Sequence, residues 1–374
     1  SEKAFRESLS ASMKDLPWEI VQDDVESIKG SFEILSENLL VGIYKTQYDP
    51  AVKETGKISG DIAEAIIDAR ITVDKTLPMK GIIVEVFEGY ISEHKVEKKD
   101  IWADRDMALT EKDKLTPVVI GIWDAGTDPE VFGQAMHINK KEKLDGKDTD
   151  SNGYVDDLHG IAYGLWSNGK SPDMLYPLSE EEYDRFPSML IQMKGLQDIQ
   201  SNIDSDEAKD LKQKLAAMQV EEVSPFLEEL GLLGNFAHGT HVAGIASAGN
   251  PAARILVMRE TFPHKPIPEP LMKSDAERWV KNSMEIVNYL KQQGVRVVNM
   301  SWGLDQKSLE SVLEVNAIGA DSEERAIMAN ESFDILYKGF SKAIKSAPGI
   351  LFVPAAGNSD NDVDFVRSIP GHID

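Results

Sequence analysis

The chain has 374 residues, enough for two domains or for one large domain with insertions. Apolar residues make up 41% of it and charged residues 28%, the proportions of an ordinary folded protein. The formal net charge of −24 argues against a nucleic-acid-binding protein, because phosphates are bound by clustered Lys and Arg. The absence of cysteine excludes disulfides, thiolate chemistry and Cys-ligated zinc.

Residues 1–110 form a first region with its own pattern. Apolar residues recur at helical spacing in residues 31–44 and 61–70, while residues 81–88 (GIIVEVFE) alternate enough to predict a strand. The charged run at residues 93–106 indicates a solvated linker or helix face. We interpret the region as an N-terminal extension of unknown role, with a prodomain or an adaptor as alternatives. No run here or elsewhere has the length of a membrane span, and no signal peptide opens the sequence.

Residues 111–374 are predicted to form the second domain, which is of the α/β class. Continuous apolar runs rich in β-branched residues predict buried strands at residues 117–123, 253–260, 295–300 and 350–354. Helical patterns at residues 275–293 and 323–346 separate the later strands, and Gly294 is suited to a left-handed helix cap. This alternation of strands and helices predicts a mostly parallel sheet.

A segment within this domain breaks the pattern. Residues 179–185 and 204–220 are highly charged and helical in period, and three prolines punctuate the region around them. We therefore expect a helical insertion over about residues 170–234, as a surface excursion of the second domain.

Two residues stand where a sheet-based crevice would place its chemistry. Asp124 ends the run PVVIGIW, and the carboxyl ends of parallel strands line the binding crevice of open α/β sheets. His238 lies in residues 235–245 (NFAHGTHVAGI), whose small residues suit a helix packed closely against a sheet. We expect this helix to begin near His238 and to hold its imidazole against the Asp124 carboxylate. A rigid element of this kind suits a catalytic base, although a buried core histidine is the structural alternative.

Four short blocks, in this order, resemble the subtilisin-like serine peptidases, the S8-type subtilases. They are WDAGTD (residues 123–128), HGTHVAGIA (238–246), VVNMSWG (297–303) and PAAGNSD (354–360). The resemblance implies a three-layer αβα fold with a mostly parallel sheet, and serine endopeptidase activity on polypeptides. The family places its nucleophile in a later Gly-Thr-Ser motif, and the sequence reaches Asp374 without one. We therefore expect a fold that is incomplete at its C-terminus, with the serine beyond it.

The same resemblance assigns roles to individual residues. His238 is implied as the general base, Asp124 as the residue that orients it, and Asn358 as a side-chain donor to the oxyanion. The backbone of Ser301, Trp302 and Gly303 is implied to bind substrate as an added strand, with Trp302 in the place of the family's leucine. A secreted or periplasmic location is also implied. The alternative function is a catalytically inactive relative that only binds peptides.

Two places in the sequence carry residues of the kinds that bind metals. His238 and His241 are three residues apart without an adjacent Glu, whereas zinc-binding helices space their histidines by four, so no metal ligand is assigned there. Residues 148–156 (DTDSNGYVD) resemble the first nine positions of an EF-hand loop, but His159 stands where the bidentate Glu belongs. Peptide hydrolysis by a serine peptidase needs no cofactor. For the loop at residues 148–156 there are two interpretations, a calcium site and a solvated acidic turn.

Overall fold

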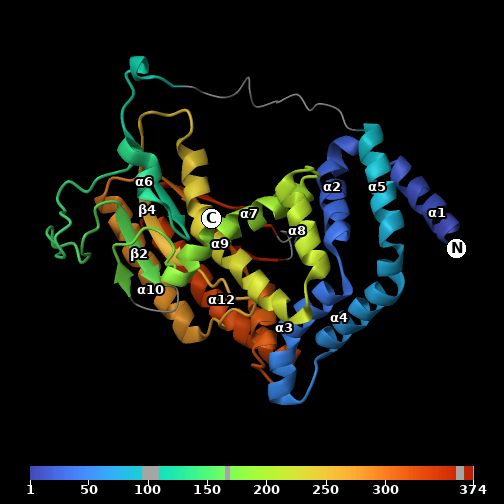
Figure 1. Ribbon diagram of the computed structural model, residues 1–374. Coiled ribbons are helices and arrows are strands. Elements are labelled where there is room, and N and C mark those ends of the chain that lie inside the picture. The colour runs from blue at the N-terminus through green and yellow to red at the C-terminus, as the bar shows by residue number, and fades with distance from the viewer. Residues whose placement is uncertain (95–108, 165–168, 359–365, 374) are drawn as a thin grey trace. The chain divides into compact units, whose positions relative to one another are not determined.

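The computed structural model describes residues 1–94, 109–164, 169–358 and 366–373. Contacts within the chain divide it into two compact units (Figure 1). Unit 1 comprises Ser1–Ile101 and Glu180–Leu233, and unit 2 comprises Trp102–Ser179 and Gly234–Asp374. The inserted segment is therefore grouped with the N-terminal region, an association that the sequence did not indicate.

Unit 1 is helical throughout its described residues. Its helices are α1 (Glu2–Lys14), α2 (Trp18–Ile34), α3 (Glu37–Thr55), α4 (Gly60–Ile71), α5 (Lys80–His94), α7 (Glu180–Gln200), α8 (Asp206–Ala217) and the first part of α9 (Val220–Ser247). A π turn (Thr72–Thr76) and a 3-10 turn (Leu77–Met79) join α4 to α5. Ser36, Ser59 and Ser205 begin α3, α4 and α8, and each hydroxyl accepts a backbone N–H of the first turn.

The N-terminal helices and the inserted helices share one hydrophobic core. Leu39 of α3 packs in a cluster with residues of α7, α8 and α9, among them Ile199, Leu211 and Val223. At Gly30 of α2 an added Cβ would lie 2.4 Å from the Ile199 carbonyl oxygen, so the backbones touch. A second cluster joins α1, α2 and α5. The two sequence segments thus fold as one body.

One prediction for the N-terminal region is wrong, and another holds except at Leu35 and Ser36. Residues 81–88 lie in helix α5, whose buried residues Ile83, Val86, Tyr90 and Ile91 recur at helical spacing once the window is extended. Residues 31–44 contain a break, because α2 ends at Ile34 and Ser36 caps a new helix. The helix predicted at residues 61–70 is confirmed as α4. Most of the charged run at residues 93–106 lies outside the described residues.

Unit 2 contains a six-stranded sheet in the order β3-β2-β4-β1-β5-β7. The strands are β1 (Val118–Asp124), β2 (Gly160–Gly164), β3 (Lys170–Ser171), β4 (Ala253–Thr261), β5 (Val297–Met300) and β7 (Leu351–Pro354). Every pairing is parallel except that of β2 with β3. Strand order reverses at β1, where β4 lies on one side and β5 on the other. Such a switch point is where open α/β sheets form their binding crevice.

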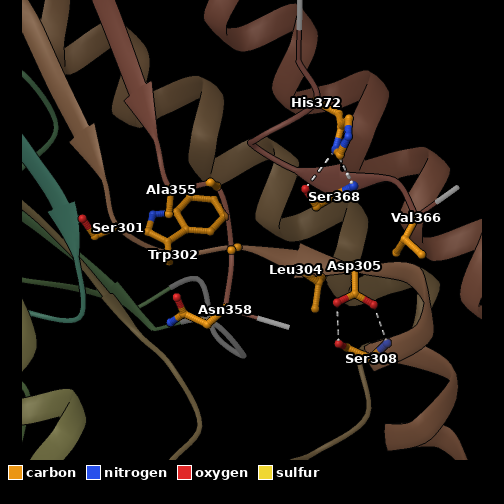
Figure 2. Close-up of a pocket in the computed structure, with 13 residues that line it drawn as sticks. Ser301, Trp302, Leu304, Asp305, Ser308, Ala355, Asn358, Val366, Ser368 and His372 are labelled. Carbon is orange, nitrogen blue, oxygen red and sulfur yellow. Dashed lines mark hydrogen bonds between the residues drawn. The ribbon is translucent and has the colours of Figure 1, made fainter. Parts of the chain in front are cut away.

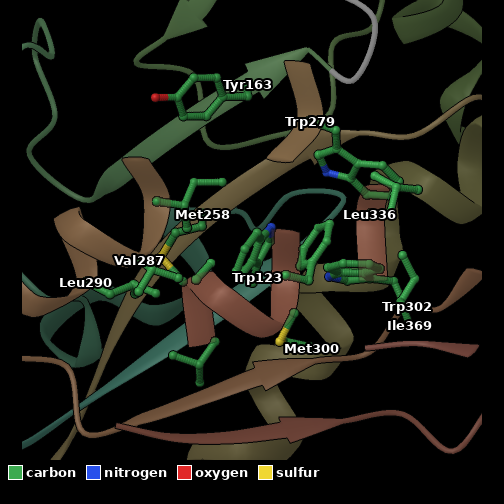
Figure 3. Packing of buried hydrophobic residues seen from close by; sticks show 14 of the residues in the cluster. Trp123, Tyr163, Met258, Trp279, Val287, Leu290, Met300, Trp302, Leu336 and Ile369 are labelled. Atoms are coloured by element: carbon green, nitrogen blue, oxygen red, sulfur yellow. The ribbon is translucent and has the colours of Figure 1, made fainter. Parts of the chain in front are cut away.

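Helices cover both faces of the sheet, which gives the three-layer αβα fold of subtilisin type expected from the sequence. One face packs against α10 (Lys273–Gln292), α11 (Gln306–Val315) and α12 (Ser322–Lys345), through the large cluster drawn in Figure 3. The other face packs against the last part of α9, through Ala243 and its neighbours. Smaller elements are α6 (Pro129–Phe132), 3-10 turns at Glu111–Asp113 and Gly133–Ala135, and a ribbon of β6 (Leu304–Asp305) and β8 (Ser368–Ile369).

The strand predictions for unit 2 are confirmed, and so are α10, α12 and the left-handed Gly294, whose φ is +70°. The predicted start of the histidine helix is wrong. Helix α9 begins at Val220, so His238 lies well inside it and not at its N-terminus. The helix continues through Pro225, Gly231 and Gly234, residues whose presence predicts a break before His238.

Candidate active site

Asp124 is placed by the alternation of strand β1. Ile122 packs on the α9 face of the sheet and Trp123 on the opposite face, so Asp124, two residues beyond Ile122, faces α9. The carboxylate is 2% exposed. Its Oδ1 accepts the Ala125 backbone N–H at 2.7 Å, and its buried Oδ2 has no hydrogen-bond partner among the described residues. Asp124 is thus a fixed, desolvated acceptor.

His238 reaches Asp124 from helix α9. Its Nδ1 lies 2.7 Å from Asp124 Oδ1, as expected from the sequence, and with the carboxylate ionised this nitrogen donates. The side chain is 49% exposed, and Nε2 has no partner within the described residues. The hydrogen bond to Asp124 raises the pKa of His238, against a smaller opposing effect of burial. This geometry leaves the Nε2 lone pair facing outward as a proton acceptor.

Gly239 sets how closely the helix approaches the strand end. A Cβ at this position would lie 2.1 Å from the Gly126 carbonyl oxygen and 3.2 Å from the Asp124 Cβ. Gly126 has a φ of +145°, a conformation available to glycine. One residue further along, Thr240 Oγ1 accepts the Asp128 backbone N–H at 3.0 Å. Residues 238–240 (HGT) therefore hold helix α9 against residues 126–128 (GTD), the loop that follows β1.

A pocket of about 470 Å³ lies beyond the ends of β5 and β7 (Figure 2). Ser301, Trp302 and Gly303 line it on one side, and Ala355 to Asn358 on the other. The Ser301 hydroxyl donates to Asn299 Oδ1 at 2.8 Å. Asn358 is exposed at the pocket. Asp124 and His238 are not among the described residues that line this pocket, so the structure brings the six predicted residues together as two groups.

Trp302 forms a wall of this pocket from the core side. The residue is 9% exposed and its ring packs against Trp123, Trp279 and Phe340 with centroids 5.8, 5.5 and 5.5 Å away (Figure 3). Such aromatic packing adds to ordinary apolar burial. Trp302 therefore extends the core beneath the pocket.

Glu260 is a buried acid that sequence reasoning missed. It lies on β4 on the same face as Met258, is 0% exposed, and accepts Trp279 Nε1 at 2.6 Å through Oε2. Burial raises the pKa of Glu260 to about 8, so the carboxyl is protonated at neutral pH. The sequence signal for a buried acid was a single Glu at the end of the apolar run ARILVMRE. A Glu in that place is equally typical of a strand whose end is exposed to solvent.

Carboxylates of the acidic loop accept the backbone N–H groups of its turns. Asp148 accepts the backbone N–H groups of Asn152 and Gly153, and Asp156 accepts those of residues 145 and 146. His159 Nδ1 is bonded to a backbone carbonyl. Carboxylate oxygens of Glu142, Asp150 and Asp157 instead lie within 4.8 Å of one another, the one such cluster found in the described ranges. These three carboxylates form a group that could hold a metal ion.

The comparison with known families agrees with the four sequence blocks and with the sheet. The model of the subtilase family, peptidase S8, matches residues 116–371. The chain belongs to the subtilase family. No curated protein and no solved structure was found to match it. Across the described ranges, no helix combines the length and the apolar character needed to cross a bilayer.

Proposed function

We propose that this subtilase is a serine endopeptidase in which His238 is the general base, Asp124 orients it, and Asn358 stabilises the oxyanion. The observation that carries the proposal is the 2.7 Å contact between His238 Nδ1 and the buried Asp124 carboxylate. A structural core histidine would be enclosed, whereas this imidazole is half exposed and its Nε2 is available. Asp before His is also the chain order of subtilisin itself.

The proposed chemistry begins with a proton transfer. Nε2 of His238 accepts the proton of an attacking hydroxyl, while Asp124 keeps the other ring nitrogen protonated and stabilises the imidazolium that forms. The imidazolium then returns the proton to the leaving amine. The raised pKa of His238 supports this role, because it makes the imidazole a stronger base than a free histidine.

Substrate is proposed to bind as an extended strand along Ser301, Trp302 and Gly303. These residues follow β5 and lead away from the sheet, so their backbone groups are not engaged in its ladder. The adjoining pocket has the volume of a small-ligand site and suits a substrate side chain. Asn358 at its rim is a neutral amide, which can donate to a developing negative charge without an ion pair in the ground state.

The proposal includes a serine outside residues 1–374, because these residues contain no Gly-Thr-Ser motif. The second candidate is an inactive subtilase that only binds peptides. The two functions differ in the coding sequence that follows Asp374. A Gly-Thr-Ser there supports the peptidase, and a stop without one supports the binding module.

The activity test uses the gene product carried through that downstream sequence, with casein as substrate. His238→Ala should lower kcat/KM by at least about a hundredfold. His241→Ala is the matched control, because His241 is an exposed histidine three residues along the same helix. Asn358→Ala should cost about a hundredfold to a thousandfold in kcat, the range known for the corresponding donor in subtilisin. Equal activity in the His238 and His241 variants would contradict the proposal.

We also propose the domain arrangement and location implied by the family. The peptidase domain takes residues 111–374 with an insertion over about residues 170–234, and residues 1–110 form an extension. The core that the extension shares with the insertion supports a single accessory body. Secretion or a periplasmic location is proposed because the family is commonly extracellular.

A further inference from the structure

Arg259 lies next to the candidate active site, near the end of strand β4. In the register of β4 with β1 it pairs with Asp124. Val257, two residues earlier on β4, packs with Ala243 of α9. Because the side chains of a strand alternate between its faces, Arg259 faces α9 as Asp124 does.

The Arg259 guanidinium is buried without an ion pair. The residue is 6% exposed and forms no ion pair within the described ranges. Burial lowers the pKa of Arg259, and the charge of Asp173 only partly offsets this effect. An unpaired buried charge is unfavourable unless hydrogen bonds compensate for the lost water. Nη1 of Arg259 donates to the Leu175 carbonyl oxygen, whereas the buried Nε has no hydrogen-bond partner among the described residues. The bond to Leu175 is therefore the contact that a role for Arg259 has to explain.

Residues 174–176, which we call the arm, are held at two points. Leu175, in the middle of the arm, accepts the hydrogen bond from Arg259. Tyr176, at its end, donates its hydroxyl to the Phe262 carbonyl oxygen at 2.7 Å. Tyr176 is 4% exposed, so its ring is packed as well as hydrogen-bonded. Strand β4 and the segment that follows it thus fix the position of the arm.

The arm lies directly against the loop that follows β1. The Thr127 N–H donates to the carbonyl oxygen of Met174 in the arm at 2.8 Å. A Cβ at Gly126 would lie 2.7 Å from the Tyr176 nitrogen, so the two backbones touch. Gly126 also meets α9, because a Cβ at Gly239 would lie 2.1 Å from the Gly126 carbonyl oxygen. Close backbone contacts therefore run from the arm through Gly126 to α9.

We propose that Arg259 is a positioning residue for the Asp124–His238 pair. It fixes the arm, the arm supports Gly126, and Gly126 sets the place of α9 and hence of the His238 imidazole. Among the described residues Arg259 forms no hydrogen bond with either member of the pair, so it acts through the backbone and takes no part in proton transfer. Its effect on turnover rests on the proposed peptidase function, whereas its effect on His238 does not.

The first measurement is an NMR titration of His238 in the chain of residues 1–374. Arg259→Met removes the guanidinium and leaves the Leu175 carbonyl without its donor, so the arm and the loop are less constrained. The 2.7 Å contact between His238 and Asp124 should then be formed less often. Because that hydrogen bond is the main cause of the raised pKa of His238, the pKa should fall towards its ordinary value of 6.5.

The second measurement is turnover by the gene product carried through the sequence after Asp374. In Arg259→Met, kcat should fall by about tenfold to a hundredfold, as expected when a catalytic group is displaced by a fraction of an ångström to one ångström. KM should change little, because neither Arg259 nor the arm lines the pocket proposed to bind substrate. A residue that only stabilised the fold would not separate kcat from KM in this way.

Two variants control for the loss of an arginine. Arg254 lies on the same strand, and its Nη1 also donates to backbone carbonyls, those of Pro251 and Ala253. Arg254→Met is the matched control and should leave the pKa of His238 and kcat unchanged. Arg259→Lys keeps a cationic donor for the Leu175 carbonyl, so it should restore the pKa of His238 and most of kcat.

Tyr176→Phe decides the matter if Arg259→Met does not fold. It loosens the arm without removing a charge, since only the hydroxyl that bonds the Phe262 carbonyl is lost. It should lower the pKa of His238 in the same direction. A folded Arg259→Met protein with an unchanged His238 titration would overturn the proposal even if its Tm were lower, and so would an unchanged titration in Tyr176→Phe. Absence of activity in the unmodified gene product would refute the proposed function instead, and the titration would still decide the role of Arg259.

Discussion

Gly239→Ala tests the geometry on which the candidate site depends. The added Cβ would lie 2.1 Å from the Gly126 carbonyl oxygen, and both partners are backbone, so no side chain can turn aside. The helix and the loop must separate by about 1 Å before this contact reaches the 3.0 Å that real Cβ atoms respect. Because His238 is the preceding residue, its imidazole moves with the helix. A displacement of that size takes the 2.7 Å contact with Asp124 out of hydrogen-bond range.

The expected effect has two parts. Overpacking of this kind costs about 1–3 kcal/mol, which lowers the Tm by several degrees in a unit of this size. Loss of the Asp124 hydrogen bond also removes the main cause of the raised pKa of His238, which should fall towards its ordinary value of 6.5. Gly244→Ala is the matched control, since it lies on the same helix with nothing within 4 Å of the added Cβ. That change should be neutral or stabilise the helix by up to about 1 kcal/mol.

The two measurements are thermal unfolding of both variants and an NMR titration of the His238 ring protons. The reasoning requires the Gly239 variant to show a lower Tm and a lower His238 pKa, and the Gly244 variant to show neither. A Gly239→Ala protein with an unchanged Tm and an unchanged His238 titration would refute it. The helix would then not be held against Gly126 as the structure indicates.

Three further predictions concern pH and packing. In Asp124→Asn, the pKa of His238 should fall, because the hydrogen bond that raises it is lost. In the unmodified chain the Asp124–His238 pair adds stability below about pH 6.5, and this stability is lost as the pH rises through the raised pKa. Unfolding measurements at several pH values should show that the variant lacks this contribution. Because the Glu260 carboxyl ionises at a lower pH in the unfolded chain than in the folded one, the free energy of unfolding should fall as the pH rises from 4.5 to about 8. Glu260→Gln should make the free energy of unfolding, measured with urea at several pH values, less dependent on pH in this range. An unchanged pH dependence would contradict a buried, protonated Glu260. Trp302→Ala should cost about 3–5 kcal/mol by chemical denaturation, and a loss below about 1 kcal/mol would mean that the ring is not part of the core.

The sequence predicted the sheet and the position of the Asp–His pair because both follow from local patterns. A strand buried on two faces is a continuous apolar run, so PVVIGIW and ARILVMRE could be recognised without knowing their neighbours. The parallel sheet then brings the ends of its strands to one edge, which is why Asp124 was expected near the histidine helix. The family resemblance identified which histidine of the pair His238 and His241 would face it.

What the sequence did not reveal depends on contacts between distant segments. The run GIIVEVFE has strand-forming residues, but burial of Tyr90 and Ile91 in the same core makes its helical face the more favourable one. The association of the insertion with the N-terminal helices rests on contacts such as Gly30 with Ile199, which no local pattern records. Glu260 is similar, because burial raises its pKa, and that burial depends on the packing of distant segments and not on its sequence neighbours.

The alternation of β1 ties the candidate active site to the core beneath it. Asp124 faces α9 only because Trp123 faces the opposite way, where it packs against Trp302 under the pocket beyond β5 and β7. A shift of one residue in the pairing of β1 with β4 would exchange these positions, burying a carboxylate among aromatic rings and placing an indole where Gly239 of α9 approaches the strand end. Both outcomes are unfavourable, so the buried tryptophans hold the register that aims the carboxylate at His238. Trp302 therefore supports, through packing, the position of the Asp124 carboxylate beside His238.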